Sequence, residues 1–385
     1  MKKITFLVLF SLICLANQAQ YQIGHRSITY QDPARSNRAI ATEIYYPATT
    51  AGDNTPFEAG QFPLLVFGHG FVMTWDVYDD FWTTLVPLGY VMVFSTTESS
   101  FSPSHPNFGM DLAFLINQMK AENANAASPF YQTLTDKSAV MGHSMGGGSS
   151  FLACANNTVP DVMVTFAAAN TTPSSITAAQ SVTIPCLLFS GEKDCVAPPA
   201  THQQPMFDSL ATNCKFLVTI LNGGHCYFAN NSTYCTLGES TCLPVVPISR
   251  AEQQATAFDI LKPYLAYYLK SDVAAWTSFS DSLQQSSRIT SQINCPTLMN
   301  VKSISKSNDL KLYPNPVLDV LNISNNIEGV ITDIIITSIS GKILLEEKGF
   351  NSNKISLSTA SLPSGVYFLE VNTKECVYRS KFIKQ

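Results

Sequence analysis

One stretch constrains the fold of this chain more than any other, the segment Ser-Ala-Val-Met-Gly-His-Ser-Met-Gly-Gly-Gly at 138–148. Its apolar run ends in Gly-x-Ser-x-Gly, and a second apolar run begins at Phe151. This order of strand, sharp turn and helix is typical of a nucleophile elbow, in which Ser144 is the nucleophile. Gly142 and Gly146 fit that interpretation, because they remove Cβ atoms that would clash where strand and helix come closest. The alternative is a glycine-rich turn with an inert serine.

Short apolar segments alternate with helical patterns on both sides of this turn. We expect strands at 38–47, 62–67, 90–95, 162–167, 184–190 and 216–221, and helices at about 78–86, 108–120, 201–210 and 251–269. Apolar strands of about five or six residues that alternate with helices form a mainly parallel sheet covered on both faces. The sequence therefore predicts an α/β fold for this region.

The two ends of the chain differ from this central part. A basic head, an apolar run at 4–16 and Ala-Asn-Gln-Ala-Gln indicate a secretory signal peptide at 1–19, because the run is too short to span a bilayer. A catalytic domain is expected at 20–297 and a polar linker at 298–309. Residues 310–385 hold short alternating segments broken by Asn, Gly and Pro, which is the pattern of a small all-β sandwich.

Charge is distributed unevenly between the expected domains. Residues 21–301 carry 11 Lys and Arg against 20 Asp and Glu, a net charge of −9. Residues 302–385 carry 10 against 8, a net charge of +2. An acidic catalytic part does not neutralise phosphates, so we expect no nucleic-acid partner and an uncharged or weakly charged substrate. We also expect a monomer.

Three further segments come directly after predicted strands, where ligands collect in parallel sheets. Gly-His-Gly-Phe occupies 68–71, Gly-Glu-Lys-Asp-Cys-Val-Ala-Pro-Pro occupies 191–199, and Asn-Gly-Gly-His occupies 222–225. The first segment can supply a backbone N–H to an oxyanion, so the expected donors are Phe71 and Met145, the residue after the nucleophile. A plain glycine-rich turn is the alternative for the first segment.

The other two segments offer an acid and a base for Ser144. Asp194 and Glu192 can both orient a histidine, and Asp194 is favoured because it lies deeper in its loop, whereas Glu192 adjoins the strand. Of the six histidines, only His225 ends a strand that follows the acid. We therefore predict a triad of Ser144, Asp194 and His225, in the chain order used by hydrolases that have a nucleophile elbow.

Ten cysteines are present, one in the expected signal peptide, one in the tail and eight at 154–295. In an exported chain without a Cys-x-x-Cys pair they favour disulfides over a metal site, and eight cysteines allow about 105 pairings. Cys195 follows the acid and Cys226 follows the base. Contact between acid and base would bring these neighbours within disulfide reach, so we expect Cys195–Cys226. Cys235 and Cys242 are expected to close a small surface loop.

The three glycine-rich segments of the site together resemble one family. Gly-His-Ser-Met-Gly-Gly-Gly at 142–148, Glu-Lys-Asp-Cys-Val-Ala-Pro at 192–198 and Asn-Gly-Gly-His at 222–225 are similar to motifs of bacterial cutinases and poly(ethylene terephthalate) (PET) hydrolases. Dienelactone hydrolases and platelet-activating-factor acetylhydrolase-like lipases lie close to that group. The resemblance covers about residues 38–270. It implies an α/β-hydrolase fold, the triad and oxyanion donors named above, no cofactor, and an open cleft that accepts esters.

One position departs from the polyester-cleaving members of that family. After the strand at 162–167 they place a tryptophan that clamps the acyl part of the substrate, and this chain has Asn170 there. Phe71 would be the other half of the aromatic clamp. We expect Phe71, Trp75 and Met145 to form an apolar wall near the nucleophile. Asn170 is expected to weaken polyester cleavage without abolishing it.

Three short motifs distinguish the tail: Tyr-Pro-Asn-Pro at 313–316, Leu-Pro-Ser-Gly-Val-Tyr at 362–367 and Lys-Phe-Ile-Lys at 381–384. Together they resemble the C-terminal sorting domain of the type IX secretion system of Bacteroidetes. The resemblance implies export through the periplasm and across the outer membrane by that machinery. Removal of the tail would follow, with release of the enzyme or its attachment at the cell surface.

These observations predict a secreted serine carboxylic-ester hydrolase that acts through an acyl-enzyme, with a cutinase-like capacity to hydrolyse PET. A lipase or a dienelactone-type esterase that acts on small esters, without polyester activity, is the alternative within the same chemistry. A peptidase with the same triad and a non-catalytic surface adhesin are alternatives from other function classes. An intact triad argues against the adhesin.

Overall fold

The computed structural model of this chain describes residues 20–155, 159–242, 246–296, 303–305, 310–325, 330–338, 342–373 and 376–385. Contacts between Cα atoms divide the chain into two compact units, with the division between Cys295 and Pro296. The expected signal peptide at 1–19 lies outside the described residues, as does most of the expected linker at 298–309.

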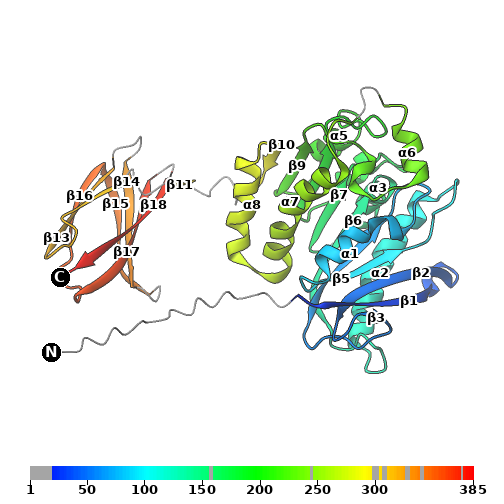
Figure 1. Ribbon diagram of the computed structural model, residues 1–385, viewed down its shortest axis with the longest axis horizontal. Helices are drawn as coiled ribbons and strands as arrows, with labels where there is room; N and C mark the ends of the chain where they lie inside the picture. Colours follow the sequence, from blue (N-terminus) through cyan, green and yellow to red (C-terminus); the bar gives the residue numbers. More distant parts are fainter. Residues whose placement is uncertain are drawn as a thin grey trace, which may run out of the picture. The chain divides into compact units, whose positions relative to one another are not determined.

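The first unit is built on a ten-stranded sheet in the order β10-β9-β8-β7-β6-β4-β5-β2-β1-β3 (Figure 1). Its strands are β1 Gln22–Asp32, β2 Arg38–Ala48, β3 Gly52–Asp53, β4 Phe62–Gly68, β5 Val91–Ser95, β6 Leu134–His143, β7 Val162–Phe166, β8 Cys186–Gly191, β9 Lys215–Ile220 and β10 Ile289–Asn294. The six neighbours from β9 to β5 run parallel to one another. Antiparallel pairs join β10 to β9, β2 to β5 and β1 to β2. This mainly parallel sheet confirms the predicted α/β-hydrolase fold.

Eight α-helices and three short 3₁₀ helices are described in the first unit. The α-helices are α1 Asp79–Leu85, α2 His105–Ala124, α3 Met145–Cys154, α4 Ser175–Ala179, α5 Gln203–Ser209, α6 Thr233–Glu239, α7 Arg250–Lys270 and α8 Val273–Gln285. The 3₁₀ helices are η1 Pro33–Arg35, η2 Trp75–Tyr78 and η3 Cys226–Phe228. Among the helices of the described residues, none has the length and apolar character needed to cross a bilayer.

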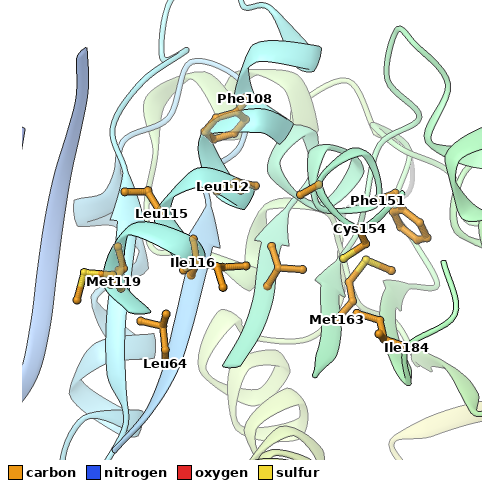
Figure 2. Close-up of a cluster of buried hydrophobic side chains, with 14 of the residues drawn as sticks. Leu64, Phe108, Leu112, Leu115, Ile116, Met119, Phe151, Cys154, Met163 and Ile184 are labelled. Carbon is orange, nitrogen blue, oxygen red and sulfur yellow. The ribbon is translucent and has the colours of Figure 1, made fainter. Parts of the chain in front are cut away.

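Alternate residues of β4 pack into two different cores. Leu64 and Val66 belong to a cluster of buried side chains that includes Leu112 of α2, and Figure 2 shows α2 lying over the strands of the sheet. Phe67 lies on the opposite side of the pleat, where its ring centroid is 4.9 Å from that of Phe81 in α1. All seven residues of β4 are buried, because helices cover both faces of the sheet.

The strands and helices expected from the sequence form within a few residues of their predicted bounds. The prediction missed the strands β1, β3 and β10 and the helices α4, α6 and α8. β1 begins Gln-Ile-Gly-His-Arg-Ser and has only a weak apolar alternation, which explains why it was missed. Antiparallel pairing with β2 along its whole length, from Gln22 opposite Ala48 to Asp32 opposite Arg38, defines β1 instead.

The second unit is a small β-sandwich, as the sequence predicts. A five-stranded sheet has the order β11-β18-β17-β14-β15, and a three-stranded sheet has the order β12-β13-β16. The strands are β11 Ser303–Ser305, β12 Leu310–Tyr313, β13 Val320–Asn325, β14 Ile331–Ser338, β15 Ile343–Ser352, β16 Lys354–Ser358, β17 Gly365–Thr373 and β18 Cys376–Lys384. Buried residues of both sheets, such as Leu321 and Ile336, share one core. Residues 303–305, expected in a linker, pair with β18 and belong to this sandwich.

Candidate active site

Ser144 lies at a sharp turn between β6 and α3. Its backbone has φ 54° and ψ −117°, a combination that is strained for a residue with a side chain. A Cβ on Gly142 would lie 2.4 Å from the carbonyl carbon of Gly146, and a Cβ on Gly146 would lie 2.1 Å from the carbonyl oxygen of Gly68. The turn therefore requires glycine at both positions, as the elbow interpretation expects.

The three residues of the predicted triad form one hydrogen-bonded chain. His225 Nε2 lies 2.8 Å from Ser144 Oγ, and His225 Nδ1 lies 2.8 Å from Asp194 Oδ2. The three residues follow β6, β8 and β9, so the ends of three parallel strands bring them together. The carboxylate accepts a hydrogen bond from Nδ1–H, which leaves the unprotonated Nε2 free to take a proton from the serine. The exposed fractions are 8% for Ser144, 4% for Asp194 and 2% for His225, so these three hydrogen-bonded residues are largely shielded from water.

The carboxylate of Asp194 is held in place by its own loop. Its Oδ1 accepts hydrogen bonds from the backbone N–H groups of Val196 and Ala197, at 2.9 and 2.8 Å. Its Oδ2 is thereby left facing His225. The loop that carries the acid also orients it.

Glu192, the alternative acid, has other partners. It accepts a hydrogen bond from the backbone N–H of Asn222 at 2.8 Å and another from the side chain of Lys193 at 3.1 Å. The hydrogen bond from Asn222 is the main cause that lowers the pKa of the Glu192 carboxyl. The geometry therefore favours Asp194 as the group that orients the histidine.

The two expected oxyanion donors lie on neighbouring segments. Met145 is the first residue of α3, so its N–H has no acceptor within the helix. Phe71 lies in the turn after β4, next to Gly70, and a Cβ on Gly70 would lie 3.2 Å from His143 Nδ1. The turn after β4 is thus packed against the elbow. Donation by these two N–H groups to an oxyanion stays a prediction.

A buried hydrogen-bonded chain joins the turn after β4 to the loop that carries His225. The N–H of Gly70 donates to Tyr78 Oη at 2.8 Å, Tyr78 Oη lies 2.9 Å from His143 Nδ1, and His143 Nε2 lies 3.0 Å from the carbonyl oxygen of His225. A carbonyl oxygen only accepts, so the proton of His143 is on Nε2. Burial lowers the pKa of His143 well below its usual value, which favours the neutral ring, and its Nδ1 then accepts a hydrogen bond from the Tyr78 hydroxyl.

Helix α7 fixes the peptide groups on either side of His225. The buried side-chain amide of Gln253 accepts a hydrogen bond from the N–H of Gly224 at 2.8 Å and donates one to the carbonyl oxygen of Gly224 at 2.9 Å. Arg250 Nη1 donates to two carbonyl oxygens in the turn that follows His225. These contacts hold the loop that carries His225 in place.

The residues that hold the loop of His225 in place were not predicted from the sequence. Gln253 lies on the same face of α7 as Ala257 and Ile260, which are buried. A glutamine on an apolar helix face is the signal that could have found it, because a buried amide needs partners. For Tyr78 the sequence carries no comparable signal, since a tyrosine at the end of a short helix is unremarkable.

The predicted substrate contacts lie in different surroundings. Phe71 is 47% exposed, whereas Met145 is 3% exposed and belongs to a buried hydrophobic cluster. Trp75 donates its indole N–H to a tyrosine hydroxyl of β2 at 3.1 Å. Asn170 is exposed, and its side-chain oxygen accepts a hydrogen bond from Ser174 Oγ at 2.9 Å. Substrate contact by these residues stays a prediction.

The predicted disulfide between Cys195 and Cys226 is wrong. The two cysteines do follow the acid and the base, but Asp194 and His225 meet through the ends of their side chains, so the next residues are not brought together. Cys226 begins the η3 turn, which redirects the chain at once. The bonds in the described residues are Cys195–Cys242, Cys214–Cys295 and Cys226–Cys235.

The disulfide expected between Cys235 and Cys242 is also wrong, since Cys235 bonds to Cys226, next to His225, and Cys242 bonds to Cys195, next to Asp194. Helix α6 carries Cys235, and its bond to Cys226 joins the helix to the loop of His225. Cys242 lies three residues after the end of α6, and its bond to Cys195 joins this segment to the loop of Asp194. In the described part of the chain, no group of three or more His, Cys, Asp and Glu side chains is placed to hold a metal ion.

The comparisons with known proteins match the two units separately. A profile of the family described as PET hydrolase-like matches residues 19–243. A profile described as a secretion system C-terminal sorting domain matches residues 311–385. Because that tail is a sorting domain, the chain is an exported protein, found at the cell surface or outside the cell.

Individual relatives match a shorter stretch. Cutinase 1 of Thermobifida cellulosilytica is 36% identical over 110 residues, which are 28% of this chain and 40% of that cutinase. A cutinase of Thermobifida fusca (strain YX) is also 36% identical over 110 residues, 28% of this chain and 35% of the relative. Cutinase est1 of Thermobifida alba is 33% identical over 102 residues, 26% of this chain and 32% of the relative. The chain thus spans two fifths or less of the length of these curated relatives.

The family follows from the extent of the profile match together with the geometry. The PET hydrolase-like profile covers more than half of the 385 residues, including the elbow and the loops of Asp194 and His225. The matched region supplies most of the α/β-hydrolase sheet. Ser144, Asp194 and His225 meet at the carboxyl edge of that sheet. The chain therefore belongs to the PET hydrolase-like family.

Proposed function

We propose that this chain is a secreted serine carboxylic-ester hydrolase that works through an acyl-enzyme. The observation that carries this proposal is the continuous hydrogen-bonded chain from Ser144 Oγ through His225 to Asp194. A serine hydroxyl is a weak nucleophile until an adjacent base takes its proton, and the base must be oriented by a third group. The contacts of His225 with Ser144 and with Asp194 fit both requirements, and the three side chains are largely buried.

The reaction runs in two halves. His225 Nε2 takes the Ser144 proton as Oγ attacks the ester carbonyl, and the N–H groups of Phe71 and Met145 stabilise the resulting oxyanion. Collapse of this intermediate expels the alcohol, which receives its proton from His225. Water then attacks the acyl-enzyme with the same histidine as base, and the acid is released. Throughout, Asp194 stabilises the imidazolium.

The test of this proposal compares two chromogenic substrates. We expect the secreted protein to hydrolyse p-nitrophenyl butyrate and to leave a peptide p-nitroanilide intact, because the family resemblance and the acidic surface favour neutral esters. Faster cleavage of the anilide would indicate a peptidase. Hydrolysis of neither substrate would indicate a non-catalytic surface protein and would overturn the proposal.

Polyester cleavage, with PET as a substrate, is the finer part of the proposal. It is supported by the family match and by the exposed ring of Phe71 near the elbow. Asn170 is expected to lower the polyester activity, because it has no ring to contact the substrate. An aromatic partner of the substrate ring would contribute about 0.5–1.5 kcal/mol beyond area burial. The alternative is an esterase of small esters. Loss of one ring contact lowers a rate by about tenfold or less, so we propose weak but measurable release of terephthalate units.

Replacing Asn170 by tryptophan should restore the missing half of the clamp. We expect Asn170→Trp to raise polyester release more than it raises p-nitrophenyl butyrate turnover, by up to about tenfold in the ratio of the two rates. The measurement is that ratio, for wild type and variant, on polyester film and on the soluble ester.

Asn170→Ala is the matched control, because it also removes the hydrogen bond from Ser174 but adds no ring. An unchanged or lower ratio in Asn170→Trp would mean that Asn170 does not occupy the clamp position. The esterase of small esters would then be the better assignment.

We also propose that the type IX secretion machinery recognises the tail. The tail is then removed, and the mature enzyme is a monomer. The sorting-domain match at 311–385 supports the first statement. Intact mass of the protein exported by a native-like host should correspond to a chain that ends upstream of Leu312 and remains active. A surface form that still contains residues 365–385 would contradict this expectation.

A further inference from the structure

The turn that carries the expected oxyanion donor Phe71 has a strained backbone. Val72, the next residue, has φ 53°. A β-branched side chain is seldom found in this left-handed region, and such a conformation persists only where the surrounding structure imposes it. The direction of the Phe71 N–H therefore depends on the contacts that hold this turn.

Both peptide groups that flank Gly70 have hydrogen-bond partners. The Phe71 N–H and the Gly70 carbonyl belong to one trans peptide group and point in opposite directions. That carbonyl oxygen accepts a hydrogen bond from the Met73 N–H at 3.1 Å and lies 2.8 Å from His69 Nδ1. The N–H of Gly70 itself donates to Tyr78 Oη at 2.8 Å. Fixing both groups fixes the direction of the Phe71 N–H.

The hydroxyl of Tyr78 has one proton and two neighbours that can accept it. His143 Nδ1 lies 2.9 Å from Tyr78 Oη, and Met73 Sδ lies 3.4 Å from it. The imidazole nitrogen is closer, and a thioether sulfur is only a weak acceptor. The hydroxyl therefore accepts from Gly70 and donates to His143, so it joins the turn to the histidine.

The other nitrogen of His143 continues this chain to the catalytic base. His143 Nε2–H donates to the carbonyl oxygen of His225 at 3.0 Å, and the two imidazole rings lie 4.9 Å apart. Tyr78 and His143 are both 0% exposed. Without water, a polar group that loses its partner here stays unsatisfied, so the turn and the loop of His225 cannot shift separately at little cost.

From this geometry we infer that Tyr78 and His143 are positioning residues, which hold the Phe71 N–H in the direction of the oxyanion and fix it relative to His225. This inference rests on the proposed function. Neither side chain reaches the surface, so neither touches the substrate. The oxyanion forms only after the serine attacks, so a displaced Phe71 N–H should lower kcat and leave KM nearly unchanged.

Tyr78→Phe tests the role of the hydroxyl. The variant keeps the ring, whose centroid lies 4.9 Å from that of Phe67 and 6.3 Å from that of Phe81. We expect kcat for p-nitrophenyl butyrate to fall about 10- to 100-fold while KM changes by less than about threefold. Rates are expressed per Ser144 site, counted with a phosphonate titrant, so that misfolded protein does not contribute.

The affinity of n-butylboronic acid gives a second measurement. A boronic acid forms a tetrahedral adduct with a serine hydroxyl and presents an oxygen where the oxyanion would lie. Its inhibition constant should therefore rise in Tyr78→Phe by about the factor by which kcat falls. Tyr264→Phe is the matched control, because Tyr264 is also fully buried and its Oη has no hydrogen-bond partner among the described residues. The control should keep the wild-type values.

Two variants of His143 separate hydrogen bonding from packing. Glutamine can accept from Tyr78 and donate to the His225 carbonyl, whereas phenylalanine keeps a ring and loses both bonds. We expect His143→Gln to keep kcat about tenfold closer to the wild type than His143→Phe does. If Tyr78→Phe gives no titratable enzyme, this comparison decides.

Three results would overturn the inference and leave the proposed esterase in place. They are an unchanged kcat in Tyr78→Phe, a loss that lies in KM with unchanged boronic acid affinity, and equal losses in the two His143 variants. A wild type that does not hydrolyse p-nitrophenyl butyrate would instead show that the proposed function is wrong, and the inference would fail with it.

Discussion

Ser144→Ala should lower kcat/KM for p-nitrophenyl butyrate by at least about 10³-fold. The variant keeps the elbow, the oxyanion donors and the substrate surface, but it has no hydroxyl for His225 to deprotonate. Folding should be little affected, because alanine fits wherever the serine side chain fits and, among the described residues, the hydrogen-bond partner of Ser144 Oγ is His225. The measurement is the initial rate of p-nitrophenol release at equal concentrations of wild type and variant.

Ser149→Ala is the matched control for this experiment. Ser149 lies in helix α3, which begins directly after Ser144; it is fully buried, and its Oγ has no hydrogen-bond partner among the described residues. Removing that hydroxyl should leave both the rate and the melting temperature close to those of the wild type, since no hydrogen bond is lost. A Ser144→Ala protein that retains comparable activity would refute the assignment of the nucleophile.

Those parts of the fold and site that depend on local pattern were predictable from the sequence. Strands such as β4 are continuous apolar runs because both faces of the sheet are covered, and their bounds follow from composition alone. The nucleophile, acid and base each follow such a strand, and the elbow needs glycine at positions 142 and 146. The order of Ser144, Asp194 and His225 in the chain and their positions after strands were therefore sufficient to predict that they meet.

The features that sequence reasoning missed depend on contacts between distant segments. Gln253 supports the base through a peptide group 29 residues away, and Tyr78 reaches His143 across 65 residues. The glutamine on the apolar face of α7 indicates that a buried partner exists but not which one, and Tyr78 has no local signature at all. The predicted disulfide pairings were wrong for a related reason. A hydrogen bond between two side chains fixes the ends of those side chains, whereas a disulfide requires a particular distance between the two backbones. Sequence proximity to the triad could not supply that distance.

Helix α6 shows a third kind of limit. Its segment, Thr-Tyr-Cys-Thr-Leu-Gly-Glu, has no apolar face that a core would require, and the helix buries none of its residues. Helices of this length are marginal without tertiary support. Here the bond from Cys235 to Cys226 and the bond from Cys242 to Cys195 supply that support. A helix defined by disulfides can be predicted only once their pairing is known.

Asp194→Asn should lower kcat/KM for p-nitrophenyl butyrate by roughly 10³- to 10⁴-fold, although the substitution is almost isosteric. In the wild type Oδ1 accepts from the N–H groups of Val196 and Ala197 at 2.9 and 2.8 Å. The carbonyl oxygen of asparagine must take that place, so its NH₂ group falls where Oδ2 now faces His225 Nδ1.

The consequence for the base follows from the donor and acceptor roles. An NH₂ group only donates, so His225 Nδ1 must become the acceptor and the ring proton moves to Nε2, which faces Ser144 Oγ. In that tautomer the histidine cannot take the serine proton. Glu192→Gln is the matched control, because its carboxylate binds Asn222 and Lys193 and should leave the rate near wild type. If Glu192→Gln lost activity while Asp194→Asn kept it, Glu192 would be the acid of the triad, and the hydrogen bond between Asp194 and His225 would be structural rather than catalytic.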